Sequence, residues 1–212
     1  MTLSRKYPNV RSASGTRGRH AQRMGVEANA RLTASTAAVL LILLAVEGVT
    51  VVQIRPLLTV HVFVGMLLVP PVLVKLSSTI WRFAKYYLGS PDYREKGPPM
   101  AVLRVLGPFV ALLTIVLFAS GIVLLLGPQS LHSQFQLIHK ASFILWFIFM
   151  TIHVLGHLGD TARLATKDWT SRAQRVVAGS KIRRYVLSAS LVAGVFLAFV
   201  TIPYVGPWLA RA

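Results

Sequence analysis

The chain has 212 residues, of which 54% are hydrophobic, and a formal net charge of +17 from 23 Lys/Arg and 6 Asp/Glu. Several stretches of about 20 residues carry almost no charge, which excludes a water-soluble domain and indicates an integral membrane protein. Cysteine is absent, and this excludes disulfides, thiolate-ligated iron–sulfur clusters, thiol nucleophiles and the covalent attachment of c-type haem.

Residues 1–32 precede the first apolar segment and are rich in Ser, Gly and Arg. We expect this basic tail to be disordered on the cytoplasmic side of the membrane. The basic region is longer than that of a signal peptide, and no small-residue cleavage site follows the first apolar segment. This segment is therefore interpreted as a retained helix.

Five apolar segments are long enough to cross a bilayer as helices, because about 20 residues at 1.5 Å each span the roughly 30 Å of hydrocarbon. Continuous apolar runs favour helices over the alternating pattern of a membrane β-barrel. We expect an all-α membrane protein whose antiparallel four-helix core lies within residues 33–158, with a basic loop and a fifth, covering helix in residues 159–212. The predicted spans are residues 33–53, 57–81, 102–126, 133–158 and 186–205.

The positive charges gather in segments that would lie on one side of the membrane. Seven Lys/Arg lie in residues 1–32, four in residues 82–100 and seven in residues 159–185. The positive-inside rule places this side in the cytoplasm, with the N-terminus inside and the C-terminus outside. The net charge is therefore a topology signal and an attraction to anionic lipid, and nucleic-acid binding is not expected.

Histidines occur at defined depths within these apolar segments. With this topology, His61 lies about one turn below the outer surface on the second helix, and His139 one to two turns below it on the fourth. The two imidazoles are therefore expected at the same level. His153 and His157 follow His139 by 14 and 18 residues and face the same way to within about 40°. Ionisable residues at such depths are costly and usually mark function.

Two imidazoles at one depth on two helices of a bundle can ligate haem from both sides. Gly65, one turn from His61, would let the macrocycle approach the second helix, and residues 119–121 (Ala-Ser-Gly) would do so on the third. Lys140 and Arg55 are suitably placed for the propionates. The alternative interpretation is that the imidazoles only form hydrogen bonds between helices.

Three other groups bear on chemistry. Glu47 is the one carboxylate inside a predicted span, and it is either a proton acceptor linked to redox change or a neutral acid bonded across the bundle. His153 and His157, at i and i+4, would be able to chelate a metal. However, Val154 stands where the H-E-x-x-H motif of zinc proteases has its glutamate, so proteolysis is not expected. His132, in the outer loop, is expected to be solvated.

Two segments carry a family resemblance. LLTVHVFVGMLLVPPVLVKLSSTIWRFAKYY (57–87) and LIHKASFILWFIFMTIHVLGHL (137–158) resemble the b-type cytochrome membrane subunits of formate dehydrogenases and nickel–iron hydrogenases, of the cytochrome b561-like di-haem superfamily. The chain looks still more like actinobacterial cytochrome b-like membrane proteins. The resemblance implies that His61 and His139 ligate an outer haem b and that His153 is an inner-haem ligand. The first-helix histidine of the family's inner site has no counterpart in residues 33–53.

The resemblance implies an electron-transfer subunit of an oxidoreductase in a bacterial cytoplasmic membrane. One haem b would carry electrons between the quinone pool and a redox partner at the outer face. A second haem would require His153 or His157 to act with a non-histidine ligand, with water, or with His20 from the tail. A haem-free scaffold or assembly subunit that keeps the bundle is the alternative. No residue is assigned a catalytic role.

Overall fold

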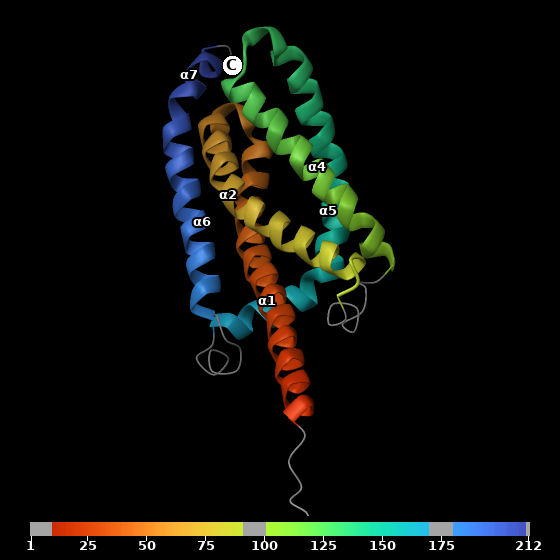
Figure 1. Cartoon of the computed structure of the whole chain (residues 1–212). Coiled ribbons are helices and arrows are strands. Elements are labelled where there is room, and N and C mark those ends of the chain that lie inside the picture. Colours follow the sequence, from red (N-terminus) through yellow and green to blue (C-terminus); the bar gives the residue numbers. More distant parts are fainter. Residues whose placement is uncertain (1–9, 91–100, 170–179, 211–212) are drawn as a thin grey trace, which may run out of the picture.

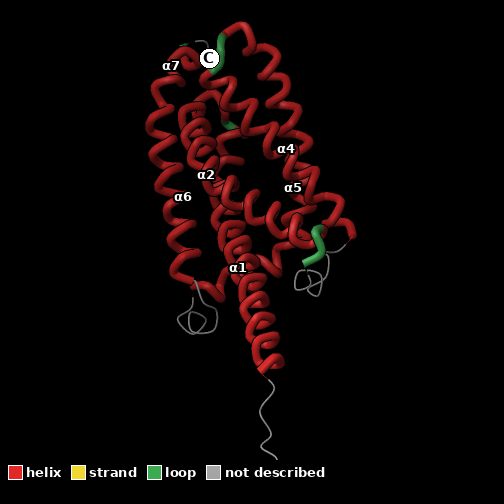
Figure 2. The backbone as a smooth tube through the Cα atoms, viewed as in Figure 1, coloured by secondary structure: helices red, strands yellow, loops and turns green. Residues whose placement is uncertain are grey.

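The computed structural model describes residues 10–90, 101–169 and 180–210, and the side chains of residues 25–90, 104–158 and 181–210. In this part of the chain the backbone is almost entirely helical and contains no strand (Figure 2). The all-α prediction is confirmed. The long helices are α1 (Val10–Val52), α2 (Ile54–Tyr87), α4 (Ala101–Leu126), α5 (His132–Trp169) and α6 (Ser180–Thr201), and the short ones are η1 (Gln129–Leu131), η3 (Ile202–Val205) and α7 (Gly206–Leu209).

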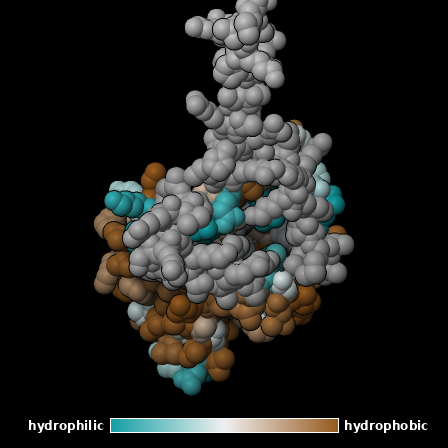
Figure 3. All heavy atoms as spheres, turned by 90° about the horizontal axis from the view of Figure 1, so that it is seen from below, coloured by the Kyte–Doolittle hydropathy of each residue, from teal (hydrophilic) through white to brown (hydrophobic). Residues whose placement is uncertain are grey.

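Five helical segments are long and apolar enough to cross a membrane, and they overlap all five predicted spans. Their flanks carry exposed apolar side chains such as Ile42, Leu112 and Phe196, which are 68%, 58% and 70% exposed. Figure 3 shows this hydrophobic surface in brown along the sides of the bundle. Lipid is the solvent that suits such a surface, and helices satisfy their own backbone groups within it. The protein is therefore a multi-pass membrane protein. The segments are residues 25–52, 54–87, 104–126, 129–158 and 181–209.

The helices run up and down through the bundle (Figure 1). We call the end that holds Gln53, residues 127–131 and α7 the hairpin end, and the opposite end the basic end. Helix α1 packs against both α2 and α5, α4 packs along α5, and α6 packs against α2, whereas α2 and α4 hardly touch. The bundle therefore consists of an α1–α2 hairpin and an α4–α5 hairpin that meet mainly through α1 and α5.

The expectation that residues 1–32 are disordered is wrong from Val10 onward, because α1 begins there and extends beyond the other helices (Figure 1). The segment HAQRMGVEANARL (20–32) is rich in Ala, Arg, Gln, Met and Glu, which all favour helix. Glu27 and Arg31 add an i,i+4 ion pair of 3.0 Å. Residues 1–9 lie outside the described part of the chain.

Pro70 and Pro71 lie inside α2, which bends strongly along its length (Figure 1). Proline has no N–H, so Pro71 leaves the carbonyl of Leu67 without its helical donor. Helix α6 approaches α2 at this carbonyl through Gly194, where an added Cβ atom would collide with the Leu67 oxygen. A small residue at this position therefore allows the fifth helix to pack closely against the bend.

We expect Gly194→Leu to lower the stability of the protein in detergent, because the new side chain meets backbone that is fixed within α2. Overpacking of this kind costs about 1–3 kcal/mol, which will appear as a lower melting temperature. Gly107→Leu in α4 is the matched control, since an added Cβ atom there meets nothing within 4 Å. Equal melting temperatures for the two variants would contradict the close packing of α6 on α2.

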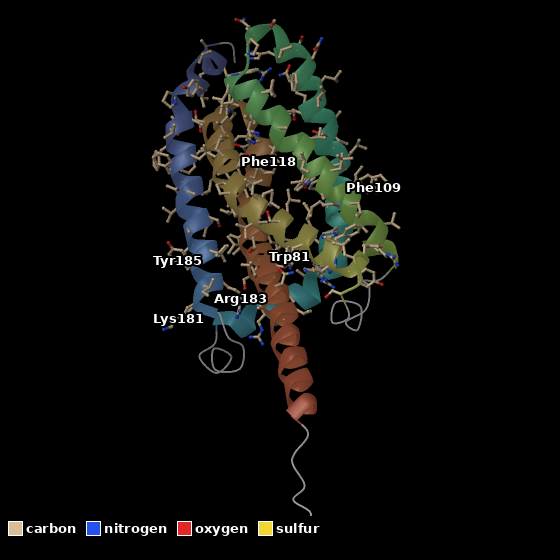
Figure 4. The ribbon with its side chains drawn as sticks, viewed as in Figure 1. Trp81, Phe109, Phe118, Lys181, Arg183 and Tyr185 are labelled. Atoms are coloured by element: carbon tan, nitrogen blue, oxygen red, sulfur yellow. The ribbon has the colours of Figure 1, made fainter. Side chains whose placement is uncertain are left out.

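The core near the middle of the bundle is made by Leu40, Val64 and Leu68, against which Phe118 of α4 packs (Figure 4). Toward the basic end, polar contacts replace apolar ones. There the hydroxyl of Thr33 donates to Ser78 Oγ at 2.9 Å. Lys75 Nζ donates to the Thr33 carbonyl at 3.2 Å, which ties α2 to α1.

The basic end combines cations with aromatic side chains, as membrane interfaces do. Trp81 and Tyr185 are 55% and 75% exposed there, close to the level of Lys181 (Figure 4). The Lys85 ammonium lies 4.8 Å from the centre of the Trp81 ring. This end therefore has the composition of a surface at headgroup level.

Candidate functional site

His61 and His139 meet in the half of the bundle nearer the hairpin end. Each follows the first residue of its helix by seven positions, Ile54 for α2 and His132 for α5. Their ring centroids are 6.3 Å apart, and the ring planes are inclined by 82°. The structure thus brings the two predicted ligands together at one level.

Helix α1 holds the His61 ring. The Nδ1 atom of His61 lies 2.8 Å from Glu47 Oε1, and the two side chains are only 21% and 15% exposed. Thr50 Oγ1 completes this group at 3.1 Å from His61 Nδ1 and donates to the Glu47 carbonyl at 2.6 Å. A carboxylate beside Nδ1 favours the tautomer that carries the proton there, so Nε2 keeps its lone pair.

Helix α4 holds the His139 ring in the same way. Its Nδ1 atom donates to the Leu117 carbonyl at 3.1 Å, because a carbonyl oxygen can only accept. Ser120 Oγ lies 3.1 Å from the same nitrogen. A Cβ atom at Gly121 would lie only 3.1 Å from His139 Cε1, so the glycine lets the ring approach the backbone of α4. Here, too, Nε2 keeps its lone pair.

His61 and His139 are the residues of this half of the bundle that would hold the iron of a haem. The 6.3 Å between the ring centroids leaves room for one metal between the two imidazoles at metal–nitrogen distances of about 2 Å. Within the described residues neither Nε2 atom has a hydrogen-bond partner, whereas both Nδ1 atoms have acceptors, the arrangement usual for metal-ligating histidines. No cluster of three or more metal-ligating side chains occurs in this part of the chain. Haem itself supplies four nitrogen ligands to its iron, so two histidines are enough to hold it. A zinc ion usually needs four ligands from the protein, so two histidines suit it less well.

The other residues predicted near this site have different surroundings. A Cβ atom at Gly65 would lie 3.6 Å from Glu47 Oε1, an ordinary contact, so nothing in the packing of α2 requires glycine there. Lys140 and Arg55 are exposed near the hairpin end. The roles of Gly65, Lys140 and Arg55 toward a cofactor stay predictions.

Glu47 was expected in this half of the bundle, but its contact with His61 was not foreseen. Gln53 lies at the turn between α1 and α2, and Glu47 is six residues before it while His61 is eight after it. These similar separations place the two residues at similar depths on neighbouring helices, which is the signal that would have predicted the contact. Thr50 and the Leu117 carbonyl were not predicted at the site. Ser120 was expected there only as a small residue within 119–121 and not as a hydrogen-bonding partner of His139. Serine and threonine within membrane helices carry no distinctive signal, because they commonly bond to their own helix.

His153 and His157 lie close together farther along α5, with ring centroids 4.7 Å apart. The Nδ1 atom of His153 is buried and has no hydrogen-bond partner among the described residues. Helix α1 offers Thr33, Ser35 and Thr36 toward the basic end rather than a histidine, and the His20 side chain lies outside the described part. The described residues therefore provide no second pair of facing histidines on two helices.

The expectation that His132 is solvated is wrong. Both of its ring nitrogens are buried, and the ring stacks on Trp208 with centroids 4.6 Å apart. The cause is the return of the chain after α6, since η3 and α7 bring Trp208 over the start of α5.

Comparisons of the chain with protein-family models, with curated proteins and with solved structures gave no match. Function is therefore inferred from the contacts of His61 and His139 and from the resemblance of residues 57–87 and 137–158.

Proposed function

We propose that the protein is a membrane b-type cytochrome that binds one haem b between His61 and His139. In this proposal it carries electrons between the quinone pool and a redox partner at the outer face. The observation that carries the proposal is the pair of imidazoles 6.3 Å apart, each with its Nδ1 atom engaged. Haem would supply the one-electron carrier, and the chain would hold it and set its potential.

Three features of the chain act on the iron ligands. The Glu47 carboxylate and the Leu117 carbonyl both accept from Nδ1, which makes the imidazoles better electron donors to iron. The apolar bundle keeps water from the site and so strengthens every charge interaction within it. Glu47, as the one carboxylate at this depth, would therefore have the largest effect on the potential.

The charge distribution supports one orientation. The positive-inside rule assigns the basic end to the cytoplasm, with the N-terminus inside and the C-terminus outside, in a bacterial cytoplasmic membrane. His61 and His139 lie about two turns, or roughly 10 Å, from the hairpin end. A haem there would lie close enough to the outer surface to serve a partner protein docked on it.

A haem-free scaffold or assembly subunit is the second candidate. It is favoured by the fact that Glu47 joins α1 to α2 and His139 joins α5 to α4 through contacts complete within the protein. Polar contacts between helices hold membrane bundles together without any cofactor.

The deciding experiment is a dithionite-reduced minus oxidised visible spectrum of the protein purified in detergent. A pyridine haemochrome assay on the same sample counts haem per chain. The proposal predicts a b-type spectrum and one haem per chain. A folded protein that carries no haem despite ample supply would establish the scaffold. Two haems per chain would refute the single-site model and point to His153.

A further inference from the structure

Positive charge gathers inside the bundle toward the basic end. Lys75 of α2 is partly buried and lies six residues before Trp81, about 9 Å along the helix from headgroup level. It is close enough to Arg82 and to His153 of α5 for their charges to interact. The ring of His157 lies next to His153, with centroids 4.7 Å apart. We call Lys75, Arg82, His153 and His157 the inner basic cluster.

Three helices meet at the level of the inner basic cluster. Thr33 of α1 lies 20 residues before Gln53, and His153 lies 21 residues after His132, so both are about 30 Å from the hairpin end. Lys75 lies at the same level, because its Nζ atom donates to the Thr33 carbonyl at 3.2 Å. The cluster is therefore separate from the candidate haem site, which lies about 20 Å nearer the hairpin end.

Lys75 has no negative partner among the described side chains. These include two carboxylates, and both are engaged elsewhere, Glu47 by His61 and Glu27 by Arg31. One backbone carbonyl of α1 accepts from the Lys75 ammonium, which has three N–H donors. Charged groups within a membrane are costly and are usually paired. The inner basic cluster thus has positive charge and donors to spare.

His153 adds an unused hydrogen-bonding atom to the cluster. Its Nδ1 atom is buried and has no partner among the described residues, although buried polar atoms nearly always have one. An imidazole can carry its proton on Nδ1, so His153 can donate from α5 while Lys75 donates from α2. Donors from two neighbouring helices suit a ligand that accepts several hydrogen bonds.

We propose that the inner basic cluster binds a phosphate-type oxyanion, with Lys75 as its counter-charge and His153 as a second donor. Such an anion brings the negative charge that Lys75 lacks and has several acceptor oxygens. The positive charges of Lys75 and Arg82 would instead repel a metal ion from His153 and His157. Exposed cations at the basic end, such as Lys181, attract anions to this end of the bundle. Binding needs no haem, because the cluster shares no residue with the candidate haem site.

The test is a calorimetric titration of the protein in detergent with inorganic phosphate, at neutral pH and at constant ionic strength set with chloride. Wild type should bind one phosphate per chain. His153→Leu should weaken binding about tenfold, the loss expected for one hydrogen bond to a charged group. Lys75→Met keeps most of the side-chain length without the charge and should weaken it further. Lys85→Met is the matched control, since Lys85 is a lysine of the same helix that lies over the Trp81 ring.

A second titration, with short-chain phosphatidic acid, distinguishes the two sources of a phosphate group. Binding of inorganic phosphate that depends on Lys75 supports a free anion as the ligand. Binding of phosphatidic acid alone, with the same dependence, assigns the phosphate group to a lipid headgroup. Binding of neither by wild type would overturn the proposal and show that the chain itself supplies the counter-charge of Lys75. An equal loss in Lys85→Met and Lys75→Met would overturn it as well, because surface attraction would then explain the binding. Should Lys75→Met fail to fold, equal binding by wild type and His153→Leu would refute the site.

Discussion

His61→Ala and His139→Ala should each reduce haem to well below one per chain, whereas His153→Ala should leave one. The first two substitutions each remove one of the two imidazoles whose ring centroids are 6.3 Å apart. Loss of either would leave the chain with one imidazole instead of two to hold the iron of a haem. His153 is the matched control because it is a histidine on the same helix, α5, and no histidine of another helix lies opposite it among the described side chains.

The pyridine haemochrome assay measures this result, and each variant needs a check that it is folded. His61→Ala leaves the Glu47 carboxylate without its Nδ1 partner in an apolar bundle, which is destabilising in itself. Adding free imidazole to His61→Ala therefore gives the sharper measurement, because the small ligand can occupy the space of the deleted ring. Recovery of the b-type spectrum would separate lost ligation from lost folding. Full haem content in both His61→Ala and His139→Ala would refute the assignment.

Glu47→Gln should raise the midpoint potential of the haem. Glutamine can still accept the Nδ1–H bond of His61 but lacks the negative charge that makes the ring a stronger donor to ferric iron. Changing such a partner typically alters metal affinity by 10–100-fold. Because the lost charge mainly stabilises ferric iron, and each tenfold change in the ferric-to-ferrous affinity ratio is 59 mV for one electron, we expect a rise of about 60–120 mV. Potentiometric titration of the b-type absorbance in detergent measures it.

Glu27→Gln is the control for this measurement. It removes a carboxylate from the same helix at the basic end, where Glu27 pairs with Arg31. Glu27 is 20 residues from Glu47, about 30 Å along α1, so its charge should barely reach the haem. A potential that is unchanged or lower in Glu47→Gln would contradict the role assigned to Glu47.

The helices and the level of the two histidines followed from the sequence because lipid imposes simple rules. An apolar helix must be long enough to cross the hydrocarbon. Residues that are the same number of positions from one membrane surface lie at the same depth. Those rules placed His61 and His139 together, and the 6.3 Å between their rings agrees with the count. The bend of α2 at Pro70 and Pro71 has a separate cause, since proline removes a backbone donor from the helix.

The remaining contacts depend on how each helix is rotated about its axis and on where the C-terminal segment folds back. The depth of a residue in the membrane determines neither. Thr50 and Ser120 reach the imidazoles only because α1 and α4 turn those residues inward. The ring nitrogens of His132 are buried because the C-terminal segment folds back to Leu124, a contact 84 residues apart in the chain. The start of α1 at Val10 does not follow from the high charge and the Ser/Gly content of the tail, which favour disorder. It follows from the helix-forming residues at 20–32, from which the helix extends toward the N-terminus.

The division of the bundle into two hairpins has a consequence for biogenesis. The α1–α2 hairpin already contains His61 with its acceptor Glu47, and the α4–α5 hairpin contains His139 with its acceptor Leu117. Each unit can thus leave the translocon with its imidazole correctly oriented. The two hairpins meet mainly through α1 and α5, whereas α2, which carries His61, hardly touches α5, which carries His139. A ligand shared by His61 and His139 would therefore add a second connection between two preformed units. Cofactor supply during synthesis would then set how many chains mature and how many are degraded.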